Sequence, residues 1–517
     1  MRKILDMIPG LKPDDSQSGA GAYVVPRDGF AAAAKALKDE GARLAAEWAS
    51  DDTPFAEGFS VYAAYASRNG YLIIRSKLPA ADPSFPSLAR KFTAARRFER
   101  QIHSLMGITP LGNPDLRPWI KHEDWPADAY PLRKTFDAGQ SLPRVEGSYG
   151  WARAEGEGVY EIAVGPVHAG VIEPGHFRFQ SVGEDIINLE TRFGYVHKGI
   201  EKRFEELSWT DAARLAGRVS GDSTAAHTLA YCRAVESMAG VAVPERAHWM
   251  RGLMVEMERL ANHLNDIGAI SNDTAFSFLL HQFSILREKV LRVCAKVFGH
   301  RLMMDKIMPG GVNVDPGDKA AKAILETIEN VAVEFERLVR IYEENPSVED
   351  RVYGTGVLTA EAAAEIGAVG FVARSSGLAL DCRADSPFPP YDGISPRIIV
   401  LNSGDVHARA WIRIEEARES MRLIREILEG MPAGPVSTPL SGVFKAGSSG
   451  FSAVEGWRGE IIYWVQAGPD GLINRCMARD PSSVNWLSIE RAIKGNIVPD
   501  FPLCNKSFNQ SYSGNDL

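Results

Sequence analysis

The chain has 517 residues, of which 45% are hydrophobic and 24% are charged, and its formal net charge is −8. This length favours two domains, and the composition is that of a globular protein. The negative charge is spread along the sequence with no long basic run, which argues against binding to nucleic acid.

The first part of the chain predicts a small α+β domain over residues 1–140. The alanine-rich stretch Phe30–Trp48 predicts a helix, and Phe59–Ala64 and Gly70–Ser76 predict two strands. A second helix is expected at Phe85–Met106, followed by an irregular tail that is rich in Pro, Trp and charge. The Gly-, Ser- and Pro-rich segment Asp137–Gly150 then predicts a linker.

The second part opens with predicted strands at Val159–Val164 and Phe177–Phe179 and becomes mainly helical from about Trp209. Within Pro244–Ile270, apolar residues recur at steps of three and four, among them Leu253, Met257 and Leu260. We interpret this stripe of Met and Leu as core and not as a cofactor site. Three further stretches have the same periodicity and predict one helical bundle: Phe276–Phe298, Lys319–Glu344 and Asp405–Glu429.

The last part of the chain is rich in turns after Gly430. It predicts a pair of strands at Phe451–Arg458 and Glu460–Ala467, then a helix at Trp486–Lys494 and an extended C-terminus.

Short motifs in both parts resemble known families. In the first part they are Glu99-Arg100-Gln101, Gly112-Asn113-Pro114-Asp115-Leu116-Arg117 and Tyr130-Pro131-Leu132-Arg133-Lys134. In the second they include Gly165-Pro166-Val167-His168, Glu173-Pro174-Gly175-His176-Phe177-Arg178, Tyr195-Val196-His197-Lys198-Gly199-Ile200-Glu201-Lys202 and Arg479-Asp480-Pro481-Ser482. The first set is similar to the 30-kDa-type subunit of complex I. The second is similar to the 49-kDa-type subunit of complex I and to the large subunit of group 4 [NiFe] hydrogenases.

The resemblance implies a 30-kDa-subunit-like α+β domain over residues 1–140. It implies a mainly α-helical bundle domain with small peripheral β elements, like the [NiFe] hydrogenase large subunit, over residues 150–517. The overall fold class expected is therefore α+β. A fused chain of both domains is typical of the hydrogenase-4 and formate-hydrogenlyase branch.

The nickel-binding cysteines of that family are absent. The family pattern R-x-C-G-x-C-x-x-x-H corresponds to Arg218 through His227, with Ser220 and Ser223 at the cysteine positions. The second cysteine pair corresponds to Ser511 and Gly514. A serine hydroxyl is a hard, protonated oxygen that cannot replace a thiolate on nickel. We therefore expect no NiFe centre and no hydrogenase activity.

The five cysteines do not restore such a site. Cys232, Cys294, Cys382, Cys476 and Cys504 are far apart and include no C-x-x-C pair. This spacing argues against a disulfide framework and against a local zinc or iron–sulfur site, and favours buried thiols. Cys232 and Cys504 lie at the wrong spacings to replace the missing nickel ligands.

The side chains that bind the quinone headgroup in complex I are also missing. The resemblance places Ile172 at the position of a histidine and Gly221 at that of a tyrosine, and neither side chain can hydrogen-bond a quinone oxygen.

Eight polar residues are expected around the altered site. Those given a catalytic role are Glu173, Asp222, His168 and His227, and those given a cofactor-binding role are Arg218, Arg479, His176 and Asp480. Glu173 is favoured for proton handling, because a partly buried carboxylate can have its pKa raised toward neutrality. For Asp222 the alternative is a solvated loop acid, for His168 and His176 a structural role, and for Arg218 and Arg479 pairing with carboxylates.

Two functions stay open at this point. One is an energy-converting oxidoreductase subunit that passes electrons from a [4Fe–4S] small subunit to a quinone or another small acceptor. The other is a non-catalytic scaffold that joins the small subunit to antiporter-like membrane subunits. Quinone-module-like membrane subunits and a ferredoxin-like subunit are further expected partners, and we expect no cofactor bound firmly by this chain itself.

The sequence also bears on localisation. No stretch approaches the roughly 20 apolar residues that span a bilayer, and the segment Met1–Asp6 meets a charge before a signal-like core can form. We expect a cytoplasmic chain that is held at the cytoplasmic face of the inner membrane through its partner subunits.

Overall fold

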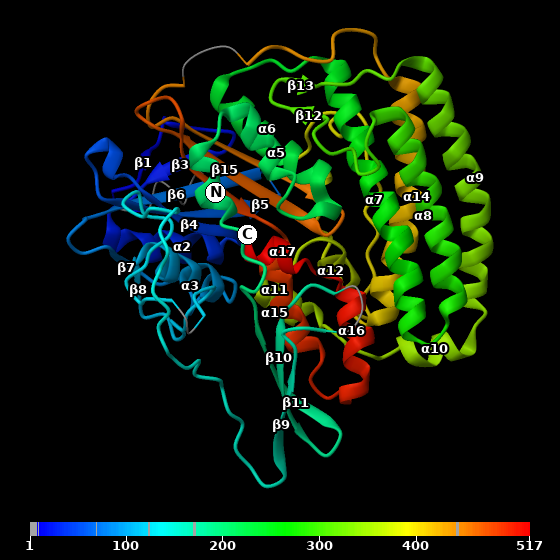
Figure 1. Ribbon diagram of the computed structural model, residues 1–517, viewed down its shortest axis with the longest axis horizontal. Coiled ribbons are helices and arrows are strands. Elements are labelled where there is room, and N and C mark those ends of the chain that lie inside the picture. Colours follow the sequence, from blue (N-terminus) through cyan, green and yellow to red (C-terminus); the bar gives the residue numbers. More distant parts are fainter. Residues whose placement is uncertain (1–7, 9, 69, 123–124, 169–171, 441–443) are drawn as a thin grey trace.

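A computed structural model describes residues 8, 10–68, 70–122, 125–168, 172–440 and 444–517 (Figure 1). The first residues, over which no signal-like segment is expected, lie outside this description. None of the described helices combines the length and the apolar character that crossing a bilayer requires.

The N-terminal part is built on a five-stranded sheet with the order β1-β3-β6-β5-β4. Its strands are β1 (Lys12–Pro13), β3 (Gly21–Val24), β4 (Arg43–Asp51), β5 (Phe59–Ser67) and β6 (Gly70–Leu78). It also contains the helices α2 (Phe30–Asp39) and α3 (Ala95–Met106), the 3-10 turns η1 (Arg27–Gly29) and η2 (Thr53–Phe55), and the small pair β7 (Ser84–Pro86) and β8 (Thr109–Leu111). The predicted strands at Phe59–Ala64 and Gly70–Ser76 are confirmed.

The expected helix Phe30–Trp48 is wrong in its second half. The helix ends at Asp39, Gly41 adopts φ +80°, and Arg43–Asp51 is the edge strand β4. Alanine is compatible with both a helix and a strand. In a strand, β4 can pack one face against α3 and the other against the second sheet, and this two-sided burial favours the strand. The second expected helix is also too long at its start, because the chain first forms β7 and α3 begins only at Ala95.

The second part combines a helical bundle with two sheets. The long helices are α7 (Glu245–Asp273), α8 (Ser277–Phe298), α9 (Gly317–Glu343) and α14 (Val406–Gly430), in agreement with the four predicted helices. They stand side by side at one end of the molecule (Figure 1). The shorter helices are α4 (Ile200–Arg203), α5 (Trp209–Ala216), α6 (Thr224–Ala239), α10 (Pro346–Val352), α11 (Ala360–Ile366), α12 (Gly370–Ser375) and α13 (Cys382–Asp385), with the 3-10 turns η3 (Phe204–Glu206) and η4 (Gly221–Ser223).

A four-stranded sheet with the order β16-β15-β14-β2 links both parts of the chain. Its strands are β2 (Gln17–Ser18), β14 (Ser449–Gly456), β15 (Gly459–Ala467) and β16 (Ile473–Arg479). The predicted strand pair is thus confirmed, and β2, which comes from the N-terminal part, joins it in parallel to β14. A separate three-stranded sheet projects from the body (Figure 1), formed by β9 (Val159–Val164), β10 (His176–Val182) and β11 (Asp185–Arg192), and β12 (Ile307–Met308) pairs with β13 (Gly311–Val312).

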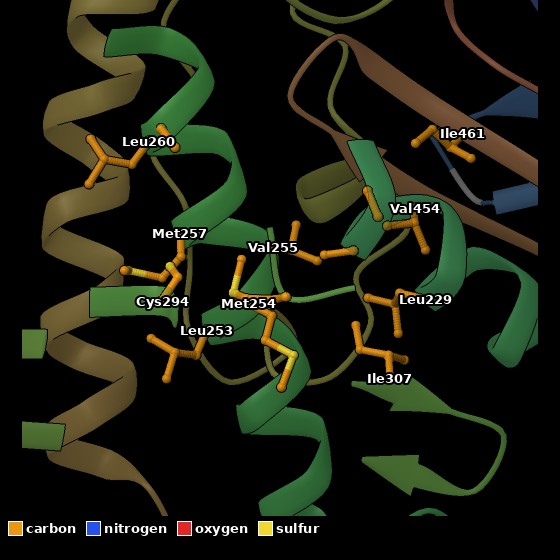
Figure 2. Packing of buried hydrophobic residues seen from close by; sticks show 14 of the residues in the cluster. Leu229, Leu253, Met254, Val255, Met257, Leu260, Cys294, Ile307, Val454 and Ile461 are labelled. Carbon is orange, nitrogen blue, oxygen red and sulfur yellow. The ribbon is translucent and has the colours of Figure 1, made fainter. Parts of the chain in front are cut away.

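The stripe of Met and Leu on α7 lies in the core, as the periodicity predicts. Met254, Met257 and Leu260 are each 0% exposed. Figure 2 shows Met257 beside Cys294 of α8, and Met254 and Val255 on the side of Leu229 and Ile307. This face of α7 is therefore filled by side chains of neighbouring helices and strands.

The C-terminal segment is helical, which corrects the expectation of an extended end. Helix α15 (Ser482–Ala492) is followed by η5 (Val498–Asp500), α16 (Phe501–Phe508) and α17 (Tyr512–Asp516). Asn509 adopts φ +40° and ends α16. Serine caps the next helix, since Ser511 Oγ accepts a hydrogen bond from the amide of Gly514. These helices bring residues 511–514 to the centre of the molecule (Figure 1).

Candidate functional site

The degenerate nickel-ligand positions come together although they lie about 290 residues apart in the chain. The Ser220 Oγ lies 2.9 Å from the Ser511 Oγ, and the amide of Gly514 donates to the same Ser511 oxygen at 2.8 Å. Ser220 precedes η4, and Ser223 is the last residue of η4, which leads directly into α6. The Ser220 hydroxyl donates to Asp222 Oδ1 at 2.9 Å, so Ser511 is the donor between the two serines.

Asp222 forms the charged part of this site with Arg458, which stands at the turn of the β14–β15 hairpin. The guanidinium reaches both carboxylate oxygens of Asp222 at 2.7 Å and also approaches Ser223 Oγ at 3.3 Å. Its Nε donates to the carbonyl of Asn509 at 2.7 Å. Two parallel N–H···O contacts fix the position of both partners.

The backbone of Asp222 is held as firmly as its side chain. Its carbonyl accepts from Trp457 Nε1 at 3.0 Å and from Asn262 Nδ2 at 2.7 Å. Burial alone would raise the pKa of Asp222, but the charge of Arg458 and the Ser220 hydroxyl outweigh it and lower the pKa. Asp222 is therefore an ionised, ion-paired residue whose side chain is 35% exposed, and not a freely solvated loop acid.

A cavity of about 570 Å³ opens in front of these residues. Ser220, Asp222, Arg458 and Ser511 form one wall, and the opposite side is built from the start of the second part and from α16. Its further lining residues are Val164, His168, Ile172, Glu173, Phe177, Gly221, Asp273, Phe501, Pro502, Asn505, Lys506, Asn509, Gln510, Tyr512 and Ser513. The volume is within the range of pockets that bind small molecules.

Glu173 and His168 line this cavity, as expected for residues near the site. Glu173 is exposed, which corrects the expectation of a partly buried carboxylate, and its Oε2 accepts from the amide of Ser513 at 3.0 Å. The ring of His168 makes a 2.7 Å hydrogen bond between Nε2 and the carbonyl of Gly175. Glu173 therefore attaches the loop before β10 to α17, and His168 forms a contact within that loop.

His227 and Asp480 lie behind the site and do not line the cavity. His227 Nε2 is 2.9 Å from Asp480 Oδ2, and its Nδ1 is 3.1 Å from the hydroxyl of Tyr463. Because an ionised carboxylate only accepts, Nε2 carries the hydrogen. Burial tends to raise the pKa of Asp480, but the hydrogen bond and charge of His227 and the charge of Arg458 hold it at about 2.

The other three expected residues lie outside the cavity. Arg218 is exposed and pairs with Asp305 at 2.8 Å. Arg479 is buried, pairs with Glu460 and donates to the carbonyl of Ala45 at 2.9 Å. His176 packs against Trp151, with 4.9 Å between the ring centroids and 43° between the ring planes.

The residues at the four positions do not fit a nickel centre. Two of the three serine hydroxyls are already hydrogen-bonded to each other, and a side chain at Gly514 would meet the carboxylate of Asp480 at 2.5 Å. In the described part of the chain, no group of three or more His, Cys, Asp or Glu side chains is arranged to hold a metal ion. Cys232 and Cys504 are buried and are not among the cavity-lining residues described here.

Sequence reasoning missed Arg458, which is the main cation of the site. The sequence does contain a feature that points to Arg458. The segment Trp457-Arg458-Gly459 joins the two predicted strands, and such turns project side chains beyond the end of the sheet. It also missed Lys198, whose Nζ donates to the carbonyls of Arg218 and Val219 at 3.1 and 3.0 Å beside the degenerate site.

The fold and this site define a class: large subunits of the [NiFe] hydrogenase and complex I type, here without metal ligands. Comparison with known proteins gives the same result. Residues 266–443 match the family of the respiratory-chain NADH dehydrogenase 49 Kd subunit, and residues 23–141 match that of the 30 Kd subunit.

Two curated relatives come from Escherichia coli (strain K12). Formate hydrogenlyase subunit 5 is 31% identical over 92% of this chain and 85% of its own length. Hydrogenase-4 component G is 30% identical over 86% of this chain and 78% of its own length. Among solved structures, a chain of the membrane-bound sulfane sulfur reductase, an archaeal respiratory membrane complex, aligns with a TM-score of 0.66 and 27% identity. That alignment covers 70% of this chain and 99% of the other. The chain therefore belongs to the family of complex I 49-kDa and group 4 hydrogenase large subunits, in the form fused to a 30-kDa-type domain.

Proposed function

We propose that this chain is the electron-accepting large subunit of a membrane-associated, energy-converting oxidoreductase complex. In this complex a [4Fe–4S] small subunit supplies electrons, and a quinone or another small acceptor takes them up in the cavity of about 570 Å³. Antiporter-like and quinone-module-like membrane subunits couple this transfer to ion translocation. The chain itself binds no nickel and no firmly held cofactor, and it is not a hydrogenase.

The observation that carries this proposal is an ordered and accessible site in place of the metal. The Asp222–Arg458 ion pair and the Ser220–Ser511 hydrogen bond fix the inner wall, and the cavity in front of them is large enough for an acceptor.

The chain's own residues would orient the acceptor and handle protons. Reduction of a quinone to a quinol takes two electrons from the iron–sulfur subunit and two protons. Glu173 is exposed on the cavity wall and can carry a proton between solvent and the acceptor oxygen. Arg458 lines the cavity and can contribute a hydrogen-bond donor toward an oxygen that gains negative charge, while Asp222 holds it in place.

Further parts of the proposal come from the relatives. They belong to membrane-bound hydrogenase and NADH-quinone oxidoreductase assemblies, which supports membrane association through partner subunits. We place the chain at the cytoplasmic face of the inner membrane, together with a ferredoxin-like subunit that feeds the small subunit.

A second function is favoured by the hydrogen bonds of the inner wall, whose polar groups are already paired within the chain. Each serine hydroxyl of the site and both oxygens of Asp222 already have partners within the chain. A wall of this kind can also be a purely structural replacement for the metal, in a scaffold that joins the small subunit to the membrane subunits.

The test is to isolate the intact complex anaerobically, reduce its iron–sulfur clusters and follow their reoxidation on adding a short-chain quinone. We expect fast reoxidation in the native complex and a loss of about 100-fold in Glu173→Gln. The matched control is Glu161→Gln, which removes an exposed carboxylate on β9 that pairs with Arg178. Clusters that other oxidants discharge but quinone does not would overturn the proposal in favour of the scaffold.

A further inference from the structure

A small chamber lies behind the degenerate site, on the side away from the large cavity. Its volume is about 30 Å³, and it is enclosed between the edge strands β4 and β16, with α3 and α17 closing it. Asp480 and Gly514 form the wall that faces the site. None of the residues given a role in the electron acceptor's cavity lines this chamber.

Glu47 projects from the edge strand β4 into this region and has no ordinary partner. Its side chain is 4% exposed, and neither carboxyl oxygen has a hydrogen-bond partner among the residues that the structure describes. Nearly all buried polar side chains in proteins are hydrogen-bonded, so a carboxyl group with two unpaired oxygens requires an explanation.

Two arginines line the same chamber as Glu47 but bind other groups. Arg475 donates to the carbonyl of Ala49 at 3.2 Å and to Glu201 at 3.0 Å. Arg479 donates to the carbonyl of Ala45 at 2.9 Å and pairs with Glu460. The arginines of β16 therefore bind the backbone on both sides of Glu47, and their charges are balanced by other carboxylates.

An unpaired carboxylate in this position would be very unfavourable, so Glu47 is expected to be neutral. Burial and the nearby Glu99 of α3 raise the pKa of Glu47 well above its usual value. Glu99 and Tyr65 interact electrostatically with Glu47, and the other ionisable groups on the chamber wall are Glu201, Arg475, Arg479 and Asp480. Of these, Arg475 and Arg479 carry the opposite charge and are already paired.

The chamber has the size and the polar lining that ordered water needs. A volume of roughly 10–15 Å³ holds one water, which then requires two to four polar partners. The two oxygens of Glu47 supply unpaired groups, and the Oδ1 of the lining residue Asn515 also lacks a partner in the described structure.

We propose that this chamber is a hydrated proton-binding site, in which Glu47 carries the proton and water supplies its missing hydrogen-bond partners. Half-buried Gln101 on the lining marks the side from which solvent exchanges with the chamber. The site therefore binds water molecules and one proton. It does not depend on the reduction of an acceptor in the large cavity. It goes beyond the proposed function, and it can be tested on the chain without any electron donor.

The first test is infrared spectroscopy of the full chain at neutral pH, in water and in heavy water. We expect an absorption of protonated carboxylic acid that shifts in heavy water and loses one component in Glu47→Gln, while Glu258, whose pKa burial raises to about 8, keeps its own contribution. Glu99→Gln is the matched control, because it removes a buried carboxyl of the same region that already accepts hydrogen bonds from Leu88, Ser87 and Asn113. Loss of that component in Glu99→Gln with no change in Glu47→Gln would overturn the assignment.

The second test is the pH dependence of unfolding in the native chain and in Glu47→Gln. A glutamate in the unfolded chain releases its proton above about pH 4.3, whereas the folded chain retains it. The native chain therefore loses stability relative to Glu47→Gln as the pH rises, by up to about tenfold in the unfolding equilibrium constant per pH unit. Parallel curves between pH 5 and 8 would show that Glu47 is ionised in the folded chain and would overturn the proposal.

Discussion

At the scale of single residues, the site has kept its framework and changed its chemistry. Three serines and a glycine occupy the ligand positions, and an aspartate–arginine pair stabilises the loop that a metal would otherwise hold. Gly514 illustrates how far the change extends, because a side chain there would contact the carboxylate of Asp480 at 2.5 Å. Restoring cysteines alone would therefore not restore the site.

The ion pair at the inner wall should contribute measurably to stability. Asp222→Asn leaves the Arg458 guanidinium, whose side chain is 4% exposed, without its charged partner. We expect a loss of roughly 1–3 kcal/mol in the free energy of unfolding, less than for a fully buried pair because Asp222 is partly solvated. Asp211→Asn, which breaks the exposed pair with Arg214, should cost less than about 1 kcal/mol. Equal losses in a denaturant titration would contradict this assignment.

His248 on α7 should make the chain sensitive to mild acid. Burial, and then the charge of Arg251, lowers the pKa of His248 to about 4. The unfolded chain takes up a proton below about pH 6.5 and the folded chain does not, so stability falls as the pH drops through that range. Relative to His248→Gln, the native chain should lose roughly 1–2 kcal/mol between pH 7 and pH 5. Thermal unfolding of both proteins at the two pH values measures this loss. If the difference in stability between the native chain and His248→Gln were the same at pH 7 and pH 5, the prediction would be refuted.

At the scale of helices and strands, the periodicity of apolar residues predicted the helices that bury one face. It failed for a strand that is buried on both faces. The four long helices have one apolar stripe each, so their sequence pattern identifies them. Strand β4 is buried on both faces and rich in alanine, so its pattern does not distinguish a strand from a helix. The short helices α16 and α17 depend on contacts that come from distant parts of the chain and have no sustained period of their own.

The same reasoning explains which site residues could be found from sequence. Ser220, Ser511, Asp222 and Asp480 lie inside family motifs, and their assembly follows from the motif order. Arg458 comes from a hairpin turn outside those motifs. Its role depends on where the turn points, and only the three-dimensional arrangement gives that.

Helix α7 provides a test of the core at this scale. Leu260 is 0% exposed and belongs to the same core cluster as residues of α8 and α14 (Figure 2). Leu260→Ala should lower the free energy of unfolding by about 2–5 kcal/mol, through lost burial and the cavity left behind. Val333→Ala on α9 is the control, because Val333 is 57% exposed and its truncation should change stability by less than about 0.5 kcal/mol. Similar midpoints of urea unfolding for both variants would contradict the assigned packing.

At the scale of the whole molecule, two sheets pack against each other and join both parts of the chain. Arg475 and Arg479 of β16 bind carbonyls of β4, and Arg43 of β4 binds Glu460 of β15 at 2.5 Å. The charges of Arg43 and Arg479 outweigh burial and lower the pKa of Glu460 to about 2. A buried ionic network thus holds the two parts together in addition to the segment that connects them.

Arg479 should therefore act on the junction and not on electron acceptance. Arg479→Gln removes a buried cation from Glu460 and should cost about 3–5 kcal/mol in the free energy of unfolding. Amide hydrogen exchange in β4 should become faster, because the clamp on the carbonyl of Ala45 is weakened. Arg491→Gln, at an exposed pair with Glu365, is the control. If Arg479→Gln kept the native rate of amide hydrogen exchange in β4 but slowed the quinone-dependent reoxidation of the clusters, Arg479 would instead have a role in electron acceptance.

The two-residue strand β2 has a consequence for how the chain is made. Gln17 receives a hydrogen bond from Ser449, 432 residues later in the chain. At a synthesis rate of ~5–20 residues per second, the ribosome needs roughly 20–90 s to deliver the partner strand. During that time the first sheet can fold, but Gln17 and Ser18 have no strand to join. Their docking is a late event in biosynthesis, and a chaperone that covers this segment would act before the second sheet emerges.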